Sequence, residues 1–193
     1  MLNFIIDQAG KIKKFFEQKR ESRRWEKLQS MGMKIGKGVY LPMTTWIDSY
    51  YCYLISIGDG CRFGPHCVIL AHDASLKQFL GAGKIGKVII HEDCSIGYGA
   101  LILPGVEIGP RAVIGAYSVV SSNIPPDTIV SGNPAKPVAK LDSYVRYHRL
   151  SMKRAALFPF KEYGSRVLPV EKRNEILNKL DSMPGYMVDE DNE

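Results

Sequence analysis

The chain has 193 residues, of which 45% are hydrophobic and 24% charged, and this composition fits one globular domain with an appended arm or tail. No stretch approaches the roughly 18 consecutive apolar residues of a membrane-spanning helix, and the N-terminus lacks a signal-peptide pattern, so we expect a cytoplasmic protein. The formal charge of +6 would suit nucleic acid, a membrane surface or a phosphorylated cofactor, but the sequence contains no nucleic-acid-binding motif.

The first predicted element is an N-terminal arm, residues 1–32, in which residues 2–30 are expected to form an amphipathic helix. Its apolar stripe lies beside a dense set of Lys and Arg and consists of Leu2, Ile5, Ile6, Ala9, Ile12 and Phe16. Such a helix can cap the open end of a repeat domain, which we favour, or lie on the anionic inner face of a membrane as a peripheral contact.

A six-residue repeat dominates the middle of the chain, which we expect to form one domain at residues 33–138. Aliphatic residues recur without a miss at Ile90, Ile96, Ile102, Ile108, Ile114 and Val120. Glycine follows at Gly97, Gly109 and Gly115, and the fifth position of each unit is small or compact. A unit of this length suits one short strand and a tight corner, with Gly supplying the unusual backbone angles of the corner and the aliphatic side chain pointing inward. Three units then close one triangular coil.

The same pattern appears upstream at Ile57, Phe63 and Ile69 and more weakly at Ile35, Leu41 and Ile47, with phase slips after Ile47 and Ile69. The second slip predicts a loop that leaves the solenoid at residues 71–87. Cys52, Cys61, Cys67 and Cys94 form no CxxC pair, so we expect buried, reduced thiols and no metal site. The last segment, residues 139–193, is predicted to be a helical tail with helices at 141–157 and 171–180.

The segment from Ile47 to Ala139 resembles the hexapeptide-repeat acyltransferases, most closely the O-acetyltransferases of surface-polysaccharide assembly and the galactoside and maltose acetyltransferases. The motifs that carry the resemblance are the repeats, Ile69-Leu-Ala-His-Asp73, Ile124-Pro-Pro126 and Gly132-Asn-Pro-Ala-Lys136. The resemblance implies an all-β solenoid, a left-handed parallel β-helix with N-terminal and C-terminal helices. It also implies a homotrimer with active sites between subunits, acetyl-CoA as co-substrate and a sugar hydroxyl of a surface-polysaccharide precursor as acceptor.

His72 is the candidate catalytic residue, because it matches the histidine of the family and lies where the repeat breaks and a polar loop begins. A neutral imidazole near pH 7 can remove the proton of an attacking hydroxyl, which contributes about 10² to 10⁴ in rate. Asp48 and Asp73 are candidates to orient the imidazole or to hold the sugar. Each also has a simpler interpretation, Asp73 as a cap of the loop and Asp48 as a turn residue. We interpret His66 and His91 as surface residues.

The positions that match the coenzyme A groove of the family are Tyr98, Ala116, Ser121, Ser122 and Lys136. Lys136 would meet a phosphate, whereas the two serines could also be an ordinary solvated turn. Relatives often have Gly where Tyr117 stands and a Thr-Lys pair where Ser121 and Ser122 stand.

The sequence also bears on three alternatives to a sugar O-acetyltransferase. A zinc-dependent hydratase of the carbonic anhydrase type would need three converging histidines, and no third histidine joins His66 and His72. A non-catalytic assembly subunit would have no need of His72 and the Asn-Pro-Ala-Lys element. An amino-sugar N-acetyltransferase remains the main alternative, because the sequence does not distinguish an oxygen from a nitrogen acceptor.

Overall fold

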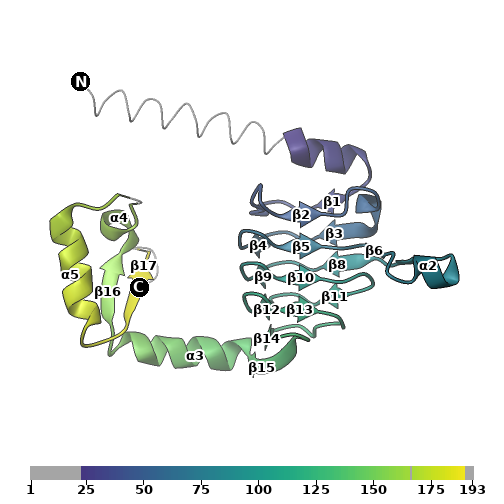
Figure 1. Ribbon diagram of the computed structural model, residues 1–193. Helices are drawn as coiled ribbons and strands as arrows, with labels where there is room; N and C mark the ends of the chain where they lie inside the picture. Colours follow the sequence, from purple (N-terminus) through teal and green to yellow (C-terminus); the bar gives the residue numbers. More distant parts are fainter. Residues whose placement is uncertain (1–22, 166, 190–193) are drawn as a thin grey trace, which may run out of the picture. The chain divides into compact units, whose positions relative to one another are not determined.

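The structure is a computed structural model that describes residues 23–165 and 167–189, and it forms two compact units, Met1–Leu141 and Asp142–Glu193. The first unit is a left-handed parallel β-helix, which confirms the fold predicted from the repeat and the resemblance (Figure 1). Its short strands stack in register on three faces of a triangular prism.

Each face is one sheet, and the strands β3 to β5 and β8 to β13 visit the three faces in turn. Face one contains β1 (Lys34–Ile35), β3 (Ile55–Ile57), β8 (Val88–Ile90) and β11 (Glu107–Ile108). Face two contains β4 (Arg62–Phe63), β9 (Ser95–Ile96), β12 (Val113–Ile114), β14 (Thr128–Ser131) and β15 (Lys136–Lys140). Face three contains β2 (Trp46–Ile47), β5 (Val68–Ile69), β10 (Leu101–Ile102) and β13 (Val119–Val120).

The core consists of the aliphatic residues of the repeat, stacked coil on coil. On face three, Ile47 pairs with Ile69, Ile69 with Ile102, and Ile102 with Val120. All four are buried, and complete burial of such a side chain stabilises the fold by about 1.5 to 3 kcal/mol. The four cysteines are buried and unpaired, as expected for packing residues.

The glycines after the aliphatic positions have a different role from the one predicted. Gly97 does not adopt a positive φ; a Cβ there would lie 2.5 Å from the backbone nitrogen of Ala116 in the next coil. The left-handed backbone instead occurs two residues later, at Gly99 (φ +65°) and Tyr117 (φ +55°). The glycine therefore permits close stacking of the coils, and the unusual backbone angle falls on another residue.

Residues 23–30 form a helix at the open end of the first coil. The guanidinium of Arg24 donates to the carbonyl oxygens of Met43 and Thr45 at 2.6 and 2.7 Å, and Leu28 is buried against the core. This part of the arm therefore covers the end of the solenoid. The predicted apolar stripe from Leu2 to Phe16 lies outside the described residues.

Both predicted phase slips correspond to irregular segments. The first contains the short 3-10 helix η1 (Cys52–Leu54). The second leaves the prism as an extruded loop with β6 (His72–Asp73), α2 (Lys77–Leu80) and β7 (Lys84–Ile85). Strands β6 and β7 pair antiparallel, and α2 lies at the tip, on the right of Figure 1.

The second unit contains more than helices. It has α3 (Leu141–Met152), β16 (Ala156–Pro159), α4 (Phe160–Tyr163), α5 (Val170–Leu180) and β17 (Gly185–Val188). The first predicted helix ends at Met152 instead of residue 157, and the following residues pair with β17 as a two-stranded parallel sheet, which the sequence did not predict. Phe158, within β16, is buried, and its ring lies 5.3 Å from that of Tyr163 in α4.

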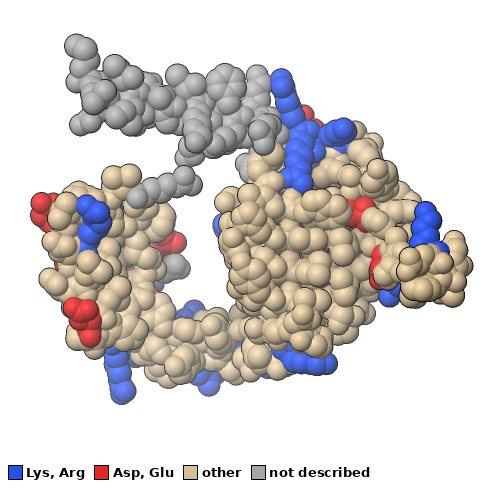
Figure 2. Space-filling model, in the orientation of Figure 1, with Lys and Arg blue, Asp and Glu red and all other residues tan. Residues whose placement is uncertain are grey.

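Charge is unevenly distributed on the view in Figure 2. Lys and Arg side chains lie near residues 23–30 and around the extruded loop, and most of the solenoid surface between them is uncharged. Within residues 23–165 and 167–189, no helix has the length and apolar character needed to cross a bilayer.

Candidate active site

Asp48 and His72 lie together at the edge between faces three and one. Asp48 follows β2 directly and His72 lies three residues after the end of β5, and these two strands pair in parallel with Ile47 opposite Ile69. The register therefore brings the residues after both strands to the same edge. The backbone nitrogen of Asp48 donates to the carbonyl of Ile69 at 3.0 Å, which fixes Asp48 beneath the start of the extruded loop.

The carboxylate of Asp48 is completely buried and is held by three donors. Oδ2 accepts from the backbone nitrogen of Ala71 at 3.2 Å and from Nδ1 of His72, and Oδ1 accepts from the backbone nitrogen of Tyr51 at 3.4 Å. A buried carboxylate requires such partners, because its desolvation is otherwise costly. The arrangement places the imidazole proton on Nδ1 and leaves Nε2 as the ring nitrogen that can accept a proton.

The imidazole of His72 is partly open to solvent, with 32% of its side chain exposed, and the ring of Tyr51 lies 5.0 Å from it. It is therefore fixed on one side by a buried carboxylate and packed against an aromatic ring, while a substrate can reach the other side. These are the geometric requirements of a general base.

Asp73 makes different contacts from Asp48. Its Oδ1 accepts from the backbone nitrogen of Ser75 at 2.8 Å, a turn at the start of the loop, and this hydrogen bond holds the pKa of Asp73 below its ordinary value. Of the two carboxylates considered from the sequence, Asp48 is the one that hydrogen-bonds to the imidazole.

The candidate cofactor residues gather around β13, the last strand of face three. Ala116 precedes this strand, Ser121 and Ser122 follow it, and all three are exposed. Lys136 lies close to β13, because the backbone nitrogen of the preceding residue, Ala135, donates to the carbonyl of Val119 in that strand at 2.8 Å. The residues present thus offer hydroxyls, a backbone corner and an exposed cation, which suits a phosphorylated cofactor.

Ser121 and Ser122 lie on the same edge as His72, two coils further along the solenoid. Since neighbouring strands are about 4.8 Å apart, the two groups are separated by roughly 10 Å along the prism. An extended cofactor can bridge such a distance. Tyr98 lies instead on the opposite edge of face three, one coil before Ala116, with its ring between those of His66 and Tyr117.

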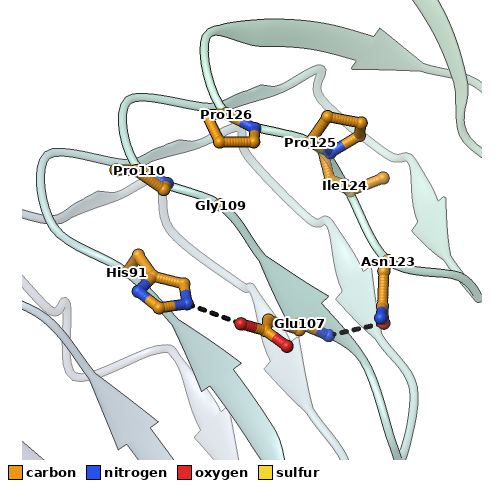
Figure 3. A pocket seen from close by; sticks show the side chains of 8 residues that line it. All are labelled: His91, Glu107, Gly109, Pro110, Asn123, Ile124, Pro125 and Pro126. Carbon is orange, nitrogen blue, oxygen red and sulfur yellow. Dashed lines mark hydrogen bonds and ion pairs between the residues drawn. The ribbon is translucent and has the colours of Figure 1, made fainter.

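His91 lies away from this site, in a shallow groove of about 330 Å³ shown in Figure 3. Its Nε2 lies 2.8 Å from Oε1 of Glu107, and the backbone nitrogen of Glu107 donates to Oδ1 of Asn123. Three prolines, Pro110, Pro125 and Pro126, form the opposite side. The side chains of His91 and Glu107 are 37% and 50% exposed, so His91 is a surface residue, as the sequence indicated. Among the described residues no cluster of three metal-ligating side chains occurs.

Comparison with known proteins places the chain in a family. The model of the bacterial transferase hexapeptide repeats matches residues 87–122. The Bacillus subtilis protein YvoF, which carries the name of an acetyltransferase, is 32% identical over 134 residues, which is 69% of this chain and 73% of YvoF.

Two solved structures share the fold. A maltose O-acetyltransferase from Clostridium difficile is 28% identical with a TM-score of 0.51, and the match covers 62% of this chain and 75% of that one. A hexapeptide-repeat acetyltransferase from Vibrio cholerae, solved with acetyl-CoA, is 23% identical with a TM-score of 0.50 over 63% and 78% of the two chains. Several further curated relatives are matched over about half of their own length.

The chain therefore belongs to the hexapeptide-repeat acetyltransferases. This is a family of acetyl-CoA-dependent O-acetyltransferases, and the resemblance seen in the sequence is confirmed. Its members act on different acceptors, so membership does not identify the acceptor of this chain.

Proposed function

We propose that the chain transfers the acetyl group of acetyl-CoA to a sugar hydroxyl of a surface-polysaccharide precursor, with His72 as general base. The observation that carries the proposal is the pairing of a completely buried carboxylate, Asp48, with a solvent-accessible imidazole at the base of the extruded loop. A structural histidine on a surface has no need of a buried anion behind it.

In this mechanism Nε2 of His72 takes the proton of the sugar hydroxyl as its oxygen attacks the thioester carbonyl. Asp48 holds the ring through Nδ1 and stabilises the imidazolium that forms. When the tetrahedral intermediate collapses, the carbon–sulfur bond breaks and the departing thiolate takes the proton from Nε2. The product is an acetyl ester and free coenzyme A, and no acyl-enzyme is needed because the thioester is already activated.

Lys136, Ser121, Ser122 and the backbone at Ala116 would hold the phosphates and the pantetheine arm. The supporting observation is that all four positions surround β13 and are exposed. In a homotrimer, which we also propose from the family, a groove between two prisms would enclose the acyl donor. Light scattering tests the trimer, and a fully active monomer would contradict it.

The experiment that tests the function is an acetyl-transfer screen with nucleotide sugars, free sugars and lipid-linked oligosaccharides. His72→Ala should lower turnover on any acceptor found by about 10² or more, and should leave the binding of coenzyme A nearly unchanged. His91→Ala is the matched control, because His91 lies in a separate groove. Wild-type turnover in His72→Ala, or transfer to amino sugars alone, would overturn the proposal.

A further inference from the structure

Positive charge is concentrated on α3, the first helix of the second unit. From residue 143 to residue 160 the sequence contains no Asp or Glu, whereas four cations lie in this stretch, Arg146, Arg149, Lys153 and Arg154. All four are exposed. Within the part of the chain that the structure describes, none of the four has a carboxylate within ion-pair distance. We call these residues the α3 cations.

Two lysines of α5, in the same unit, show the usual alternative. Nζ of Lys172 lies 3.2 Å from a carboxylate oxygen of Glu162, and Nζ of Lys179 lies 2.9 Å from one of Glu175. Their charges are thus balanced within the unit. The α3 cations repel one another without such compensation, which opposes folding slightly. The fold alone therefore does not account for them, and their charge is available to an anionic partner.

Three of the α3 cations form a stripe along the helix. Residues three and four apart are neighbours on a helix surface, and Arg146, Arg149 and Lys153 have this spacing. The other side of the helix packs within the unit, because Nδ1 of His148 lies 2.8 Å from the hydroxyl oxygen of Tyr186 in β17. The stripe therefore lies on the side turned away from the small sheet.

Two exposed hydrophobic side chains lie beside this stripe. Tyr147 is 65% exposed and Leu150 is 58% exposed, and together with Arg154 they have the same spacing of three and four residues. An exposed leucine contributes little to the fold of the unit. Aliphatic and aromatic side chains next to Lys and Arg are typical of helices that lie in the interface of an anionic bilayer. There the cations meet phosphate groups and the apolar side chains enter the acyl region.

We propose that this surface of α3 docks the protein on an anionic lipid bilayer. The docking surface consists of the four α3 cations, Tyr147 and Leu150. The exposed leucine favours a bilayer over a nucleic acid, because only the bilayer offers an apolar interior to an aliphatic side chain. Each Lys or Arg near an anionic membrane raises the affinity about fivefold. The inference goes beyond the proposed function and does not depend on the acceptor.

The test is sedimentation of the full chain with vesicles, without acetyl-CoA. Vesicles of phosphatidylglycerol and phosphatidylcholine in equal parts should bind the wild type, and vesicles of phosphatidylcholine alone should not. High salt should weaken the binding, because it screens exposed charges. Arg149→Ala/Lys153→Ala should lower the partition coefficient about 25-fold, which is about fivefold for each cation.

Arg173→Ala/Lys179→Ala is the matched control, because it removes two exposed cations from α5 in the same unit. It should bind vesicles as the wild type does. Equal losses in the two double variants would mean that net charge alone controls binding, and would overturn the proposal. An unchanged affinity in Arg149→Ala/Lys153→Ala would place the contact elsewhere in the chain, the N-terminal arm included, and would overturn it too.

Leu150→Ser distinguishes a bilayer from other polyanions. It should weaken vesicle binding about fivefold and leave binding to heparin unchanged, because heparin carries negative charge but has no apolar interior. Wild-type affinity of Leu150→Ser for vesicles would overturn the proposal, as would a wild type that binds single-stranded DNA or RNA more tightly than vesicles. Circular dichroism checks that each variant is folded. Failure of the proposed function looks different, because a protein that acetylates no sugar would still sediment with anionic vesicles.

Discussion

The Oδ2 atom of Asp48 accepts hydrogen bonds from both the Nδ1 atom of His72 and the backbone nitrogen of Ala71, so one buried carboxylate fixes the imidazole and the chain that carries it. The loop cannot move at its base without breaking both bonds. The position of His72, the proposed general base, is therefore tied to the packing of the first two coils.

Asp48→Asn should lower kcat by about 10 to 10² while KM for acetyl-CoA changes little, because the amide holds the ring less well and carries no charge to stabilise the imidazolium. A wild-type kcat in Asp48→Asn would show that Asp48 acts only in packing.

Lys136→Ala should raise KM for acetyl-CoA by about tenfold or more with a smaller effect on kcat. The change would remove the proposed contact with a phosphate, which would be made equally in the ground and transition states and be worth about 1.5 to 3 kcal/mol. Lys34→Ala, at an exposed position in the first coil, is the control and should behave as wild type. Equal KM values in the wild type and Lys136→Ala would place the phosphate contact elsewhere.

Gly97→Ala should destabilise the solenoid far more than Gly38→Ala. The new Cβ of Gly97→Ala would meet backbone atoms of the next coil at 2.5 Å, whereas at Gly38 (φ +66°) nothing lies within 4 Å. We expect about 1 kcal/mol for Gly38→Ala from backbone strain, and at least 3 kcal/mol or failure to fold for Gly97→Ala. Urea denaturation compares them, and equal losses would refute the stacking role of Gly97.

Arg24→Ala should lower the free energy of unfolding by about 1.5 to 3 kcal/mol, because two charge-assisted hydrogen bonds to carbonyl oxygens of the first coil are lost. Burial lowers the pKa of Arg24, in keeping with a guanidinium enclosed by the protein. Arg23→Ala changes an exposed neighbour and should have little effect. Thermal unfolding followed by the fluorescence of Trp25 measures both, and identical midpoints would show that residues 23–30 do not cap the solenoid.

The stability of the wild type should fall above about pH 8.5 in part through Cys67. Burial raises the pKa of this thiol, so its contribution is complete below the ordinary thiol pKa of about 8.5 and is lost as the pH rises through the higher folded value. Cys67→Ala should flatten this decline in urea midpoints between pH 8 and 10, since alanine occupies the same slot at Ala100. If the urea midpoint fell equally steeply with pH in Cys67→Ala and in the wild type, this role of Cys67 would be wrong.

The six-residue period was sufficient to predict the solenoid, because an inward aliphatic at every sixth position leaves few other ways to bury Ile96, Ile102 and Ile108. The period did not show which of Asp48 and Asp73 hydrogen-bonds to His72, since this depends on the direction of each side chain where the repeat is interrupted. The left-handed conformations of His66 and Tyr117 were also missed. Glycine normally marks such corners; histidine adopts a positive φ more often than most side chains, but a tyrosine carries no such signal.

The second unit was predicted less well for a different reason. Strands β16 and β17 pair between Ala156 and Gly185, a contact between segments far apart in the sequence. Local periodicity predicts helices such as α5, whereas pairing of two four-residue strands depends on the path of the chain between them.

The reversal of β15 has a consequence for how the protein behaves at high concentration. A parallel β-helix whose last coil ended in an open strand would present free amide and carbonyl groups to any extended chain, as the growing end of an amyloid fibril does. Here β15 turns back and pairs antiparallel with β14. The backbone nitrogen of Ala135 also donates to the carbonyl oxygen of Val119 on the neighbouring face. At the opposite end Arg24 binds the carbonyl oxygens of Met43 and Thr45. Residues of the protein itself therefore occupy backbone hydrogen-bonding groups at both ends of the solenoid. Loss of residues 132–140 should therefore first appear as end-to-end polymerisation.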